Sequence, residues 1–273
     1  MSENILSRRD FLRLSGATAL TTTLTACAGY PPVAESNPDP DSMPPHVAQA
    51  LSGAGGYSAP EKPVTLPQDA LQRLMEGNQR FVANRFLDPN RSPQRRSAVA
   101  HSQQPFATIL GCVDSRVPPE LVFDRGLGDL LVIRSAGEVL DEAVIGSIEF
   151  GSFELKIPLI VVLGHERCGA VKAAIDALEH GGGGHRRSKK KGEHSAEPGD
   201  IGYIVEGLRP AIEKAQSWGM GDLAENAMRA NVSLTVQRLR KSPVLSAAEE
   251  SGRLKIVGAR YDLDSGAVEV LFS

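Results

Sequence analysis

The sequence predicts an α/β fold in which helices flank a parallel β-sheet. Three short apolar runs, Phe106–Leu110, Leu130–Ile133 and Pro158–Leu163, contain almost no polar residues. Such continuous runs are typical of strands that are buried on both faces of a sheet. Segments with helical periodicity lie between the runs, and strands that alternate with helices favour a parallel sheet.

The remaining elements follow along the chain. From Gln68 to Arg85, apolar residues recur three, four and seven positions apart, which predicts an amphipathic helix whose apolar stripe needs a partner surface. We expect three further helices, at 141–153, 170–179 and 226–240. Two final strands are expected at 254–260 and 268–272, and the turn Asp264–Gly266 between them indicates a hairpin.

The composition places the chain among soluble globular proteins with one sizeable core. Of 273 residues, 41% are hydrophobic and 23% are charged, which excludes a fully disordered chain and a multi-span membrane protein. The 30 Lys and Arg residues stand against 33 Asp and Glu residues, and this net charge of −3 does not indicate nucleic-acid binding. Three cysteines cannot form a disulfide scaffold in a chain of this length.

Residues 1–26 have the layout of an export signal. The pair Arg8-Arg9 precedes a weakly apolar stretch, and Ser7–Leu12 resembles the twin-arginine signal, whose pathway carries folded proteins. The stretch Leu24–Cys27 resembles a bacterial lipobox. We therefore expect an exported, periplasmic protein that is anchored to a membrane through lipidated Cys27. The alternative is a soluble periplasmic protein with a cleaved signal and an incidental Cys27.

Two further segments differ in composition from a folded core. Residues 27–67 are rich in proline and glycine, so we expect a disordered tether between the anchored cysteine and a folded domain at 68–273. The stretch 180–199 holds four consecutive glycines and the basic run Arg186–Lys191. A flexible, solvated loop is expected here, and a basic surface for nucleic acid or anionic lipid is the alternative.

Two polar patterns follow predicted strands and carry the chemistry. Cys112, Asp114 and Arg116 follow the first apolar run, and His165 and Cys168 follow the third. Ligands of parallel sheets bind beyond the carboxyl ends of the strands, so these residues form a candidate site. Two thiolates and one imidazole suit zinc, whose catalytic sites keep a fourth position for water. Structural cysteines or a disulfide are alternatives, but neither predicts a carboxylate with an orienting arginine beside the first cysteine.

These motifs resemble the β-class carbonic anhydrases. The similarity runs from about Ala70 to the C-terminus, and its specific parts are CVDSRVPPELVFDRGLGDLLVIRSAG, EAVIGSIEF and PLIVVLGHERCGAVKAA, followed by Asn231-Val232 and Gly258–Asp262. The resemblance implies a core of about four parallel strands extended by a C-terminal strand. It also implies that the helix at 68–85 lies on a second subunit, so we expect a homodimer or a higher even oligomer.

The resemblance assigns roles to the same residues. One zinc ion per subunit would be held by Cys112, His165 and Cys168. Zinc lowers the pKa of bound water to about 7. A zinc-bound hydroxide, oriented by the catalytic dyad Asp114–Arg116, would convert carbon dioxide reversibly to bicarbonate and a proton. One alternative is a hydrolase of carbon disulfide or carbonyl sulfide, since relatives on this fold carry out that reaction. The other alternative is a non-catalytic module that binds zinc or bicarbonate.

Further residues are placed by the resemblance alone. Gln103 is expected to hold substrate oxygen, and the backbone N–H of Gly169 is expected to lie nearby. The sequence departs from the family pattern at Val113, Ser135 and Glu138. Of these departures, Glu138 is expected to alter the edge of the site.

One form of regulation is expected to be absent. Some β-class relatives hold bicarbonate in a second, non-catalytic pocket that needs a tryptophan, an arginine and a tyrosine. Ile109 and Gln237 occupy the tryptophan and tyrosine positions, and only Arg134 remains. A buried anion needs its hydrogen bonds satisfied, so we expect no cooperative inhibition by bicarbonate.

Overall fold

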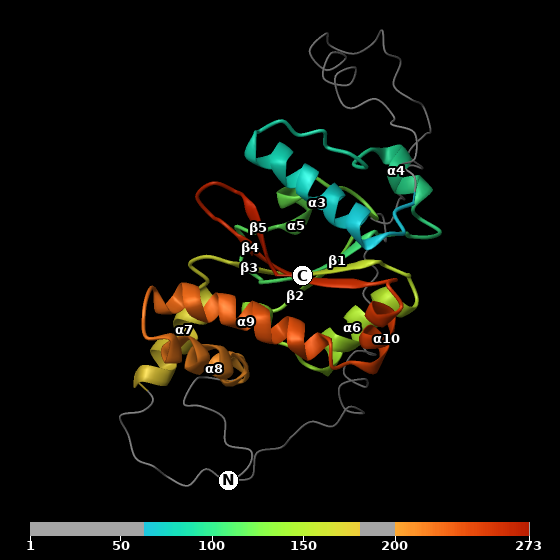
Figure 1. The fold of residues 1–273 in the computed structure, drawn as a ribbon. Helices are drawn as coiled ribbons and strands as arrows, with labels where there is room; N and C mark the ends of the chain where they lie inside the picture. Colours follow the sequence, from blue (N-terminus) through green and yellow to red (C-terminus); the bar gives the residue numbers. More distant parts are fainter. Residues whose placement is uncertain (1–62, 181–199, 273) are drawn as a thin grey trace, which may run out of the picture. The chain divides into compact units, whose positions relative to one another are not determined.

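The computed structural model describes residues 63–180 and 200–272. In this part of the chain, a five-stranded sheet with helices on both faces confirms the predicted α/β class (Figure 1). The export signal, Cys27, nearly all of the tether and the basic loop lie outside the described residues, so the expectations for them stay predictions.

The sheet has the strand order β2-β1-β3-β4-β5. Its strands are β1 (Ala107–Gly111), β2 (Leu130–Arg134), β3 (Leu159–His165), β4 (Lys255–Tyr261) and β5 (Val268–Phe272). The first four strands run parallel, whereas β5 pairs antiparallel with β4. The expected hairpin is present, since the N–H of Asp262 donates to the carbonyl of Ala267 across the turn at 2.9 Å. The predicted arrangement of four parallel strands and one C-terminal strand is therefore confirmed.

Helices cover both faces of this sheet, with α3 and α5 on one face and α6 to α10 on the other (Figure 1). The helices are α3 (Pro67–Val82), α4 (Pro93–Ala98), α5 (Pro119–Val122), α6 (Glu142–Phe153), α7 (Gly169–His180), α8 (Ile201–Trp218), α9 (Leu223–Leu239) and α10 (Pro243–Glu250). None of these helices is both long and apolar enough to cross a membrane.

The four predicted helices are present with adjusted ends. Helix α3 ends before Arg85 because Asn84 adopts the left-handed conformation, with φ +52°. Helix α6 begins after Asp141, whose side chain caps it by accepting the N–H of Val144 at 2.7 Å. The sequence-based expectations omit α4, α5, α8 and α10. Three of these, α4, α5 and α10, begin with a proline in the first turn, a start signal that the sequence does contain.

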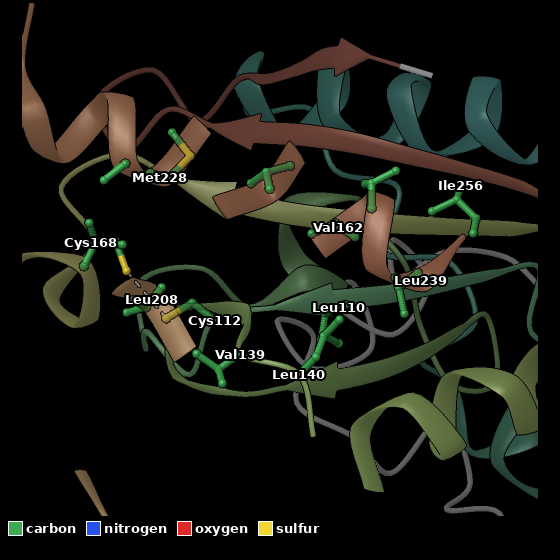
Figure 2. Close-up of a cluster of buried hydrophobic side chains, with 14 of the residues drawn as sticks. Leu110, Cys112, Val139, Leu140, Val162, Cys168, Leu208, Met228, Leu239 and Ile256 are labelled. Atoms are coloured by element: carbon green, nitrogen blue, oxygen red, sulfur yellow. Dashed lines mark hydrogen bonds between the residues drawn. The ribbon is translucent and has the colours of Figure 1, made fainter. Parts of the chain in front are cut away.

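Alternate residues of the central strands enter two separate cores. Leu110 of β1 and Val162 of β3 belong to the core beneath α6 to α10, which Figure 2 shows. Their neighbours Ile109 and Val161 belong to the core on the α3 side. The apolar runs are continuous because each strand supplies side chains to both cores.

Strand β2 differs from the expectation of burial on both faces. Its residues from Leu130 to Ile133 are only half-buried, because β2 is an edge strand with β1 as its one neighbour. Helix α6 packs against β2 and exposes Phe150 and Phe153 to solvent. This edge of the sheet therefore presents apolar surface.

Two glycines let α9 lie close to the sheet. A Cβ atom at Gly164 of β3 would lie 2.5 Å from Val232 of α9 and 2.8 Å from the sulfur of Met228. A Cβ atom at Gly258 of β4 would lie 2.8 Å from the other methyl group of Val232. The side chain of Val232 thus occupies a notch in the sheet surface over β3 and β4, which exists because both strands have a glycine there. This packing fixes the distance between α9 and the sheet.

Candidate metal centre and active site

The two predicted patterns meet at the carboxyl ends of adjacent strands. Cys112 follows β1, His165 ends β3 and Cys168 precedes α7, and β1 and β3 are neighbours in the sheet. One ligand atom of each of these three residues lies within 4.8 Å of the others. The sulfur atoms of the two cysteines are 3.9 Å apart, at one end of the buried cluster in Figure 2.

His165 is held with one ring nitrogen free for a ligand. The side chain is fully buried, and Nδ1 lies 3.0 Å from the carbonyl of Glu166. We assign the proton to Nδ1, because a carbonyl oxygen can only accept. Nε2 is buried and has no hydrogen-bond partner among the described residues. An imidazole whose second nitrogen is fixed by a carbonyl is the usual arrangement of a metal-binding histidine.

The two cysteines are electrostatically unlike each other. The hydrogen bond with Cys168 lowers the pKa of Cys112 to about 4, against burial, with further help from the backbone N–H of Gly137. The same hydrogen bond, together with burial, raises the pKa of Cys168 above its ordinary value. The hydrogen bond between the two sulfurs therefore favours the thiolate form at Cys112, and a bound cation would favour the thiolate form of both cysteines.

This donor set fits zinc. Two sulfur atoms and one imidazole nitrogen are soft and borderline ligands, and His165 keeps an unpartnered Nε2 in a cluster whose ligand atoms lie within 4.8 Å of one another. The described residues bring three protein ligands together, as catalytic zinc sites do when they keep a fourth position for water.

The predicted dyad forms beside the cluster. Arg116 donates from Nε to one carboxylate oxygen of Asp114 at 2.9 Å and from Nη2 to the other at 2.7 Å, and its backbone N–H adds a third bond at 2.9 Å. These hydrogen bonds, led by the side chain of Arg116, lower the pKa of Asp114 to about 2. Asp114 is therefore an ionised acceptor at neutral pH, held in one orientation by a two-pronged arginine.

Arg134 supports the loop between the first ligand and the dyad, a role that the sequence analysis misses. Its Nε donates to the carbonyl of Cys112 at 2.8 Å, and its Nη2 donates to the carbonyl of Asp114 at 2.6 Å. Arg134 ends β2, so the rule that placed Cys112 and His165 at strand ends would also have placed this arginine there.

The turn after β2 forms the back of the site. It is a 3₁₀ turn, η2 (Ala136–Glu138), and the N–H of Gly137 donates to the sulfur of Cys112 at 3.4 Å. Glu138 was expected to alter the edge of the site, but it is 1% exposed and lies in the interior. Burial, followed by the negative charge at Cys112, raises the pKa of Glu138 well above its ordinary value.

The two expected substrate-binding groups lie in different places. Gly169 is the exposed first residue of α7, where backbone N–H groups have no partner within the helix, and space beside it is open. Gln103 is exposed and precedes β1, whereas Cys112 follows β1. Five strand residues, roughly 17 Å at 3.3 Å each, separate the two ends. The fold therefore does not bring Gln103 to the site of its own chain.

The chain is similar to known proteins of one family. A family model described as carbonic anhydrase matches residues 107–268. The carbonic anhydrase of Mycolicibacterium smegmatis is 40% identical over 209 residues, which cover 76% of this chain and 95% of that protein. Carbonic anhydrase 2 of Mycobacterium tuberculosis is 40% identical over 204 residues, which cover 75% of this chain and 92% of that protein.

Solved structures share the fold. The β-carbonic anhydrase CcaA is 25% identical, with a TM-score of 0.54, and the match covers 73% of this chain and 94% of that one. The Coccomyxa β-carbonic anhydrase in complex with acetazolamide is 27% identical, with a TM-score of 0.53, over 74% of this chain and 86% of that one. Motifs, fold and relatives agree, and the chain belongs to the β-class carbonic anhydrase family.

Proposed function

We propose that this protein is a zinc enzyme that hydrates carbon dioxide reversibly to bicarbonate, with Cys112, His165 and Cys168 as the zinc ligands. The observation that carries the proposal is the buried, unpartnered Nε2 of His165 in a cluster where one ligand atom each of His165 and the two cysteines lie within 4.8 Å of one another. A buried polar atom without a hydrogen bond costs free energy, and a metal ion would remove that cost. Hydration of carbon dioxide is the general reaction of the family to which the chain belongs.

The chain's own residues then orient the reactants. Zinc, when bound, lowers the pKa of water from 15.7 to about 7 and so supplies a nucleophile near neutral pH. Asp114, ionised and held by Arg116, accepts a hydrogen bond from the attacking water and leaves a lone pair directed at carbon dioxide. The N–H of Gly169, at the start of α7, would donate a hydrogen bond to the substrate oxygen that becomes negative. Val113, which is 57% exposed beside the first ligand, offers apolar surface to a nonpolar substrate.

A second subunit is part of this proposal. Gln103 lies at the opposite end of β1 from Cys112, so it can hold substrate oxygen only in the site of another copy. The apolar edge formed by β2, Phe150 and Phe153 offers a surface for a homodimer or a higher even oligomer. Size-exclusion chromatography with light scattering tests the assembly. In a mixture of Gln103→Ala chains and Asp114→Asn chains, each expected to have a lowered rate by itself, a rate above that of either variant alone would show that Gln103 acts across the interface.

Stopped-flow hydration of carbon dioxide by the zinc-loaded protein tests the reaction. We expect a rate far above the uncatalysed one, and its loss on treatment with a chelator. Release of sulfide from carbon disulfide and carbonyl sulfide, measured in parallel, distinguishes the sulfur hydrolases. A protein that binds zinc but accelerates none of these reactions would instead be a binding module.

We also infer that the enzyme acts in the periplasm. The support is sequence alone: the twin-arginine pattern at Arg8-Arg9 and the lipobox-like end at Cys27. A pathway that carries folded proteins suits a chain whose metal ligands come from distant parts of the sequence. The anchored form through lipidated Cys27 is proposed, with a soluble periplasmic form as the alternative.

A further inference from the structure

The proposed function leaves one buried polar group in the site without a role. Glu138 is 1% exposed and belongs to the turn η2, the same turn whose Gly137 N–H donates to the Cys112 sulfur. A carboxyl group in the interior is costly unless its polar atoms are used. Its position in the turn that touches a proposed zinc ligand suggests that the side chain serves that ligand.

One side chain of α9 holds both residues of the turn. The Nδ2 group of Asn231 donates to the carbonyl of Gly137 at 2.7 Å and to Oε2 of Glu138 at 3.3 Å. Asn231 is itself buried, with 5% of its surface exposed. Two hydrogen bonds from one amide group therefore tie the backbone of Gly137 and the side chain of Glu138 to a helix on the core side of the site.

The turn needs such a tie, because its backbone is strained. Gly137 has φ +62° and Glu138 has φ +50°, both in the left-handed region. Glycine adopts this conformation freely, whereas a residue with a side chain is strained there. In this conformation, the N–H of Gly137 points at the Cys112 sulfur and donates a hydrogen bond to it. An N–H donor stabilises a thiolate and reduces the electron density that the sulfur gives to a metal.

We propose that Glu138 is a positioning residue of the zinc site: as a hydrogen-bond acceptor for Asn231, it locks the turn that directs the Gly137 N–H onto the Cys112 thiolate. This proposal rests on the proposed function, because it takes Cys112 to be a zinc ligand. The required feature is an acceptor oxygen on a side chain of this length. Glutamine retains such an oxygen, and methionine has a similar length but lacks it.

The test compares Glu138→Gln with Glu138→Met. Zinc affinity is measured by competition with a chelator, and the cobalt-substituted protein reports the sulfur-to-metal charge-transfer band. We expect Glu138→Gln to bind zinc within about twofold of wild type with an unshifted band. We expect Glu138→Met to bind zinc about 10-fold more weakly. Its band should move to longer wavelength, because a sulfur without its N–H donor gives up an electron more easily.

Asn231→Leu provides a second route to the same result. Leucine has nearly the shape of asparagine and removes both donated bonds, so the same band shift is expected even if Glu138→Met fails to fold. A variant that only lowers the melting temperature while its band stays in place overturns the proposal, as does Glu138→Gln behaving like Glu138→Met. Full zinc content in Cys112→Ser would instead overturn the proposed function, so the two failures can be told apart.

Discussion

The Nε2 atom of His165 lies 3.9 Å from a carboxylate oxygen of Asp114, in a site where that oxygen also receives a guanidinium N–H from Arg116 at 2.7 Å. The Asp114 carboxylate therefore lies between the exposed guanidinium group of Arg116 and the buried imidazole of His165, a proposed metal ligand. One set of residues would hold the metal and a separate set would orient the water. We therefore expect substitutions to remove the two roles independently.

Removal of any one proposed ligand should empty the metal site. Cys112→Ser, His165→Ala and Cys168→Ser are each expected to lose zinc, because the proposed site has three protein ligands and none of them would be redundant. Metal analysis of the purified variants by atomic emission checks this. Ser115→Ala, an exposed residue within the same loop, serves as the control and should keep one zinc per subunit. Full zinc in Cys112→Ser would refute the ligand set.

Loss of the Asp114 carboxylate should lower the rate of catalysis without loss of zinc. Asp114→Asn keeps all three ligands but gives a neutral group in place of an ionised acceptor, so zinc content should stay at wild-type level. The rate of carbon dioxide hydration should fall by roughly 10²-fold. Arg116→Lys removes the two-pronged contact and should give a smaller loss of rate. Stopped-flow measurements and metal analysis of the same samples decide this, and an unchanged rate in Asp114→Asn would count against the dyad.

Asp124 should stabilise the fold in a pH-dependent way. Burial raises its pKa, but hydrogen bonds from Arg80 and from the N–H groups of Leu87 and Asp88 outweigh burial and bring the pKa below its ordinary 3.8. A carboxyl with a lowered folded-state pKa stabilises the fold above the ordinary pKa, and this contribution is lost as the pH falls through the folded-state value. Asp124→Asn should therefore cost about 1–3 kcal/mol of unfolding free energy at neutral pH.

Urea unfolding of wild type and Asp124→Asn measures this difference, first at pH 7 and then at about pH 3.5, where it should shrink. The control is Asp264→Asn, whose side chain is 75% exposed in its ion pair with Arg167. That variant should change stability by less than about 1 kcal/mol. A difference for Asp124→Asn that grows as the pH falls would contradict the assignment.

Bicarbonate should not inhibit the enzyme cooperatively. Arg134 is engaged with the carbonyls of Cys112 and Asp114, and Ile109 is fully buried in the α3-side core. The described residues therefore do not turn this arginine toward a second bicarbonate pocket. Initial rates measured across bicarbonate concentrations and pH values should show simple saturation. A steep loss with a Hill coefficient well above one would show that other residues rebuild the pocket.

The N-terminal signal should determine location. Arg8→Lys combined with Arg9→Lys is expected to leave the protein in the cytoplasm, because the paired arginines are the recognised feature. Cys27→Ala is expected to move it from the membrane fraction to a soluble or unprocessed form. Cell fractionation followed by immunoblotting decides both. Wild-type protein found entirely soluble in the periplasm would reject lipidation and keep export.

The cluster of Cys112, His165 and Cys168 could be predicted because its signals in the sequence are local. Cys112 and His165 each follow a continuous apolar run, and the edge shared by parallel strands brings such positions together. The strand order was not predictable in the same way, since it depends on how the crossovers pack. The half-exposure of Leu130–Ile133 follows only from the edge position of β2 in that order.

The groups that hold the proposed ligands in position could not be predicted from the sequence for a similar reason. Asn231 reaches Gly137 from a helix more than ninety residues away in the chain, and no spacing rule links the two. The carbonyl of Glu166 fixes His165 through the backbone, so its side chain carries no signal of the role. The resemblance gives a role to Gln103, and only the direction of β1 shows that this residue lies at the opposite end of the strand from Cys112.

The notch that Gly164 and Gly258 leave for Val232 has a consequence for protein engineering. Gly164 directly precedes His165, and Val232 directly follows Asn231. The packing of Val232 on Gly164 therefore fixes the positions of both the His165 imidazole and the Asn231 amide, which holds the turn η2. If only the two cysteines and the histidine were transferred to another parallel sheet, the metal-binding atoms would be present, but nothing would hold them in the same relative positions. The graft has to include two side-chain-free strand positions and a helix seated on them.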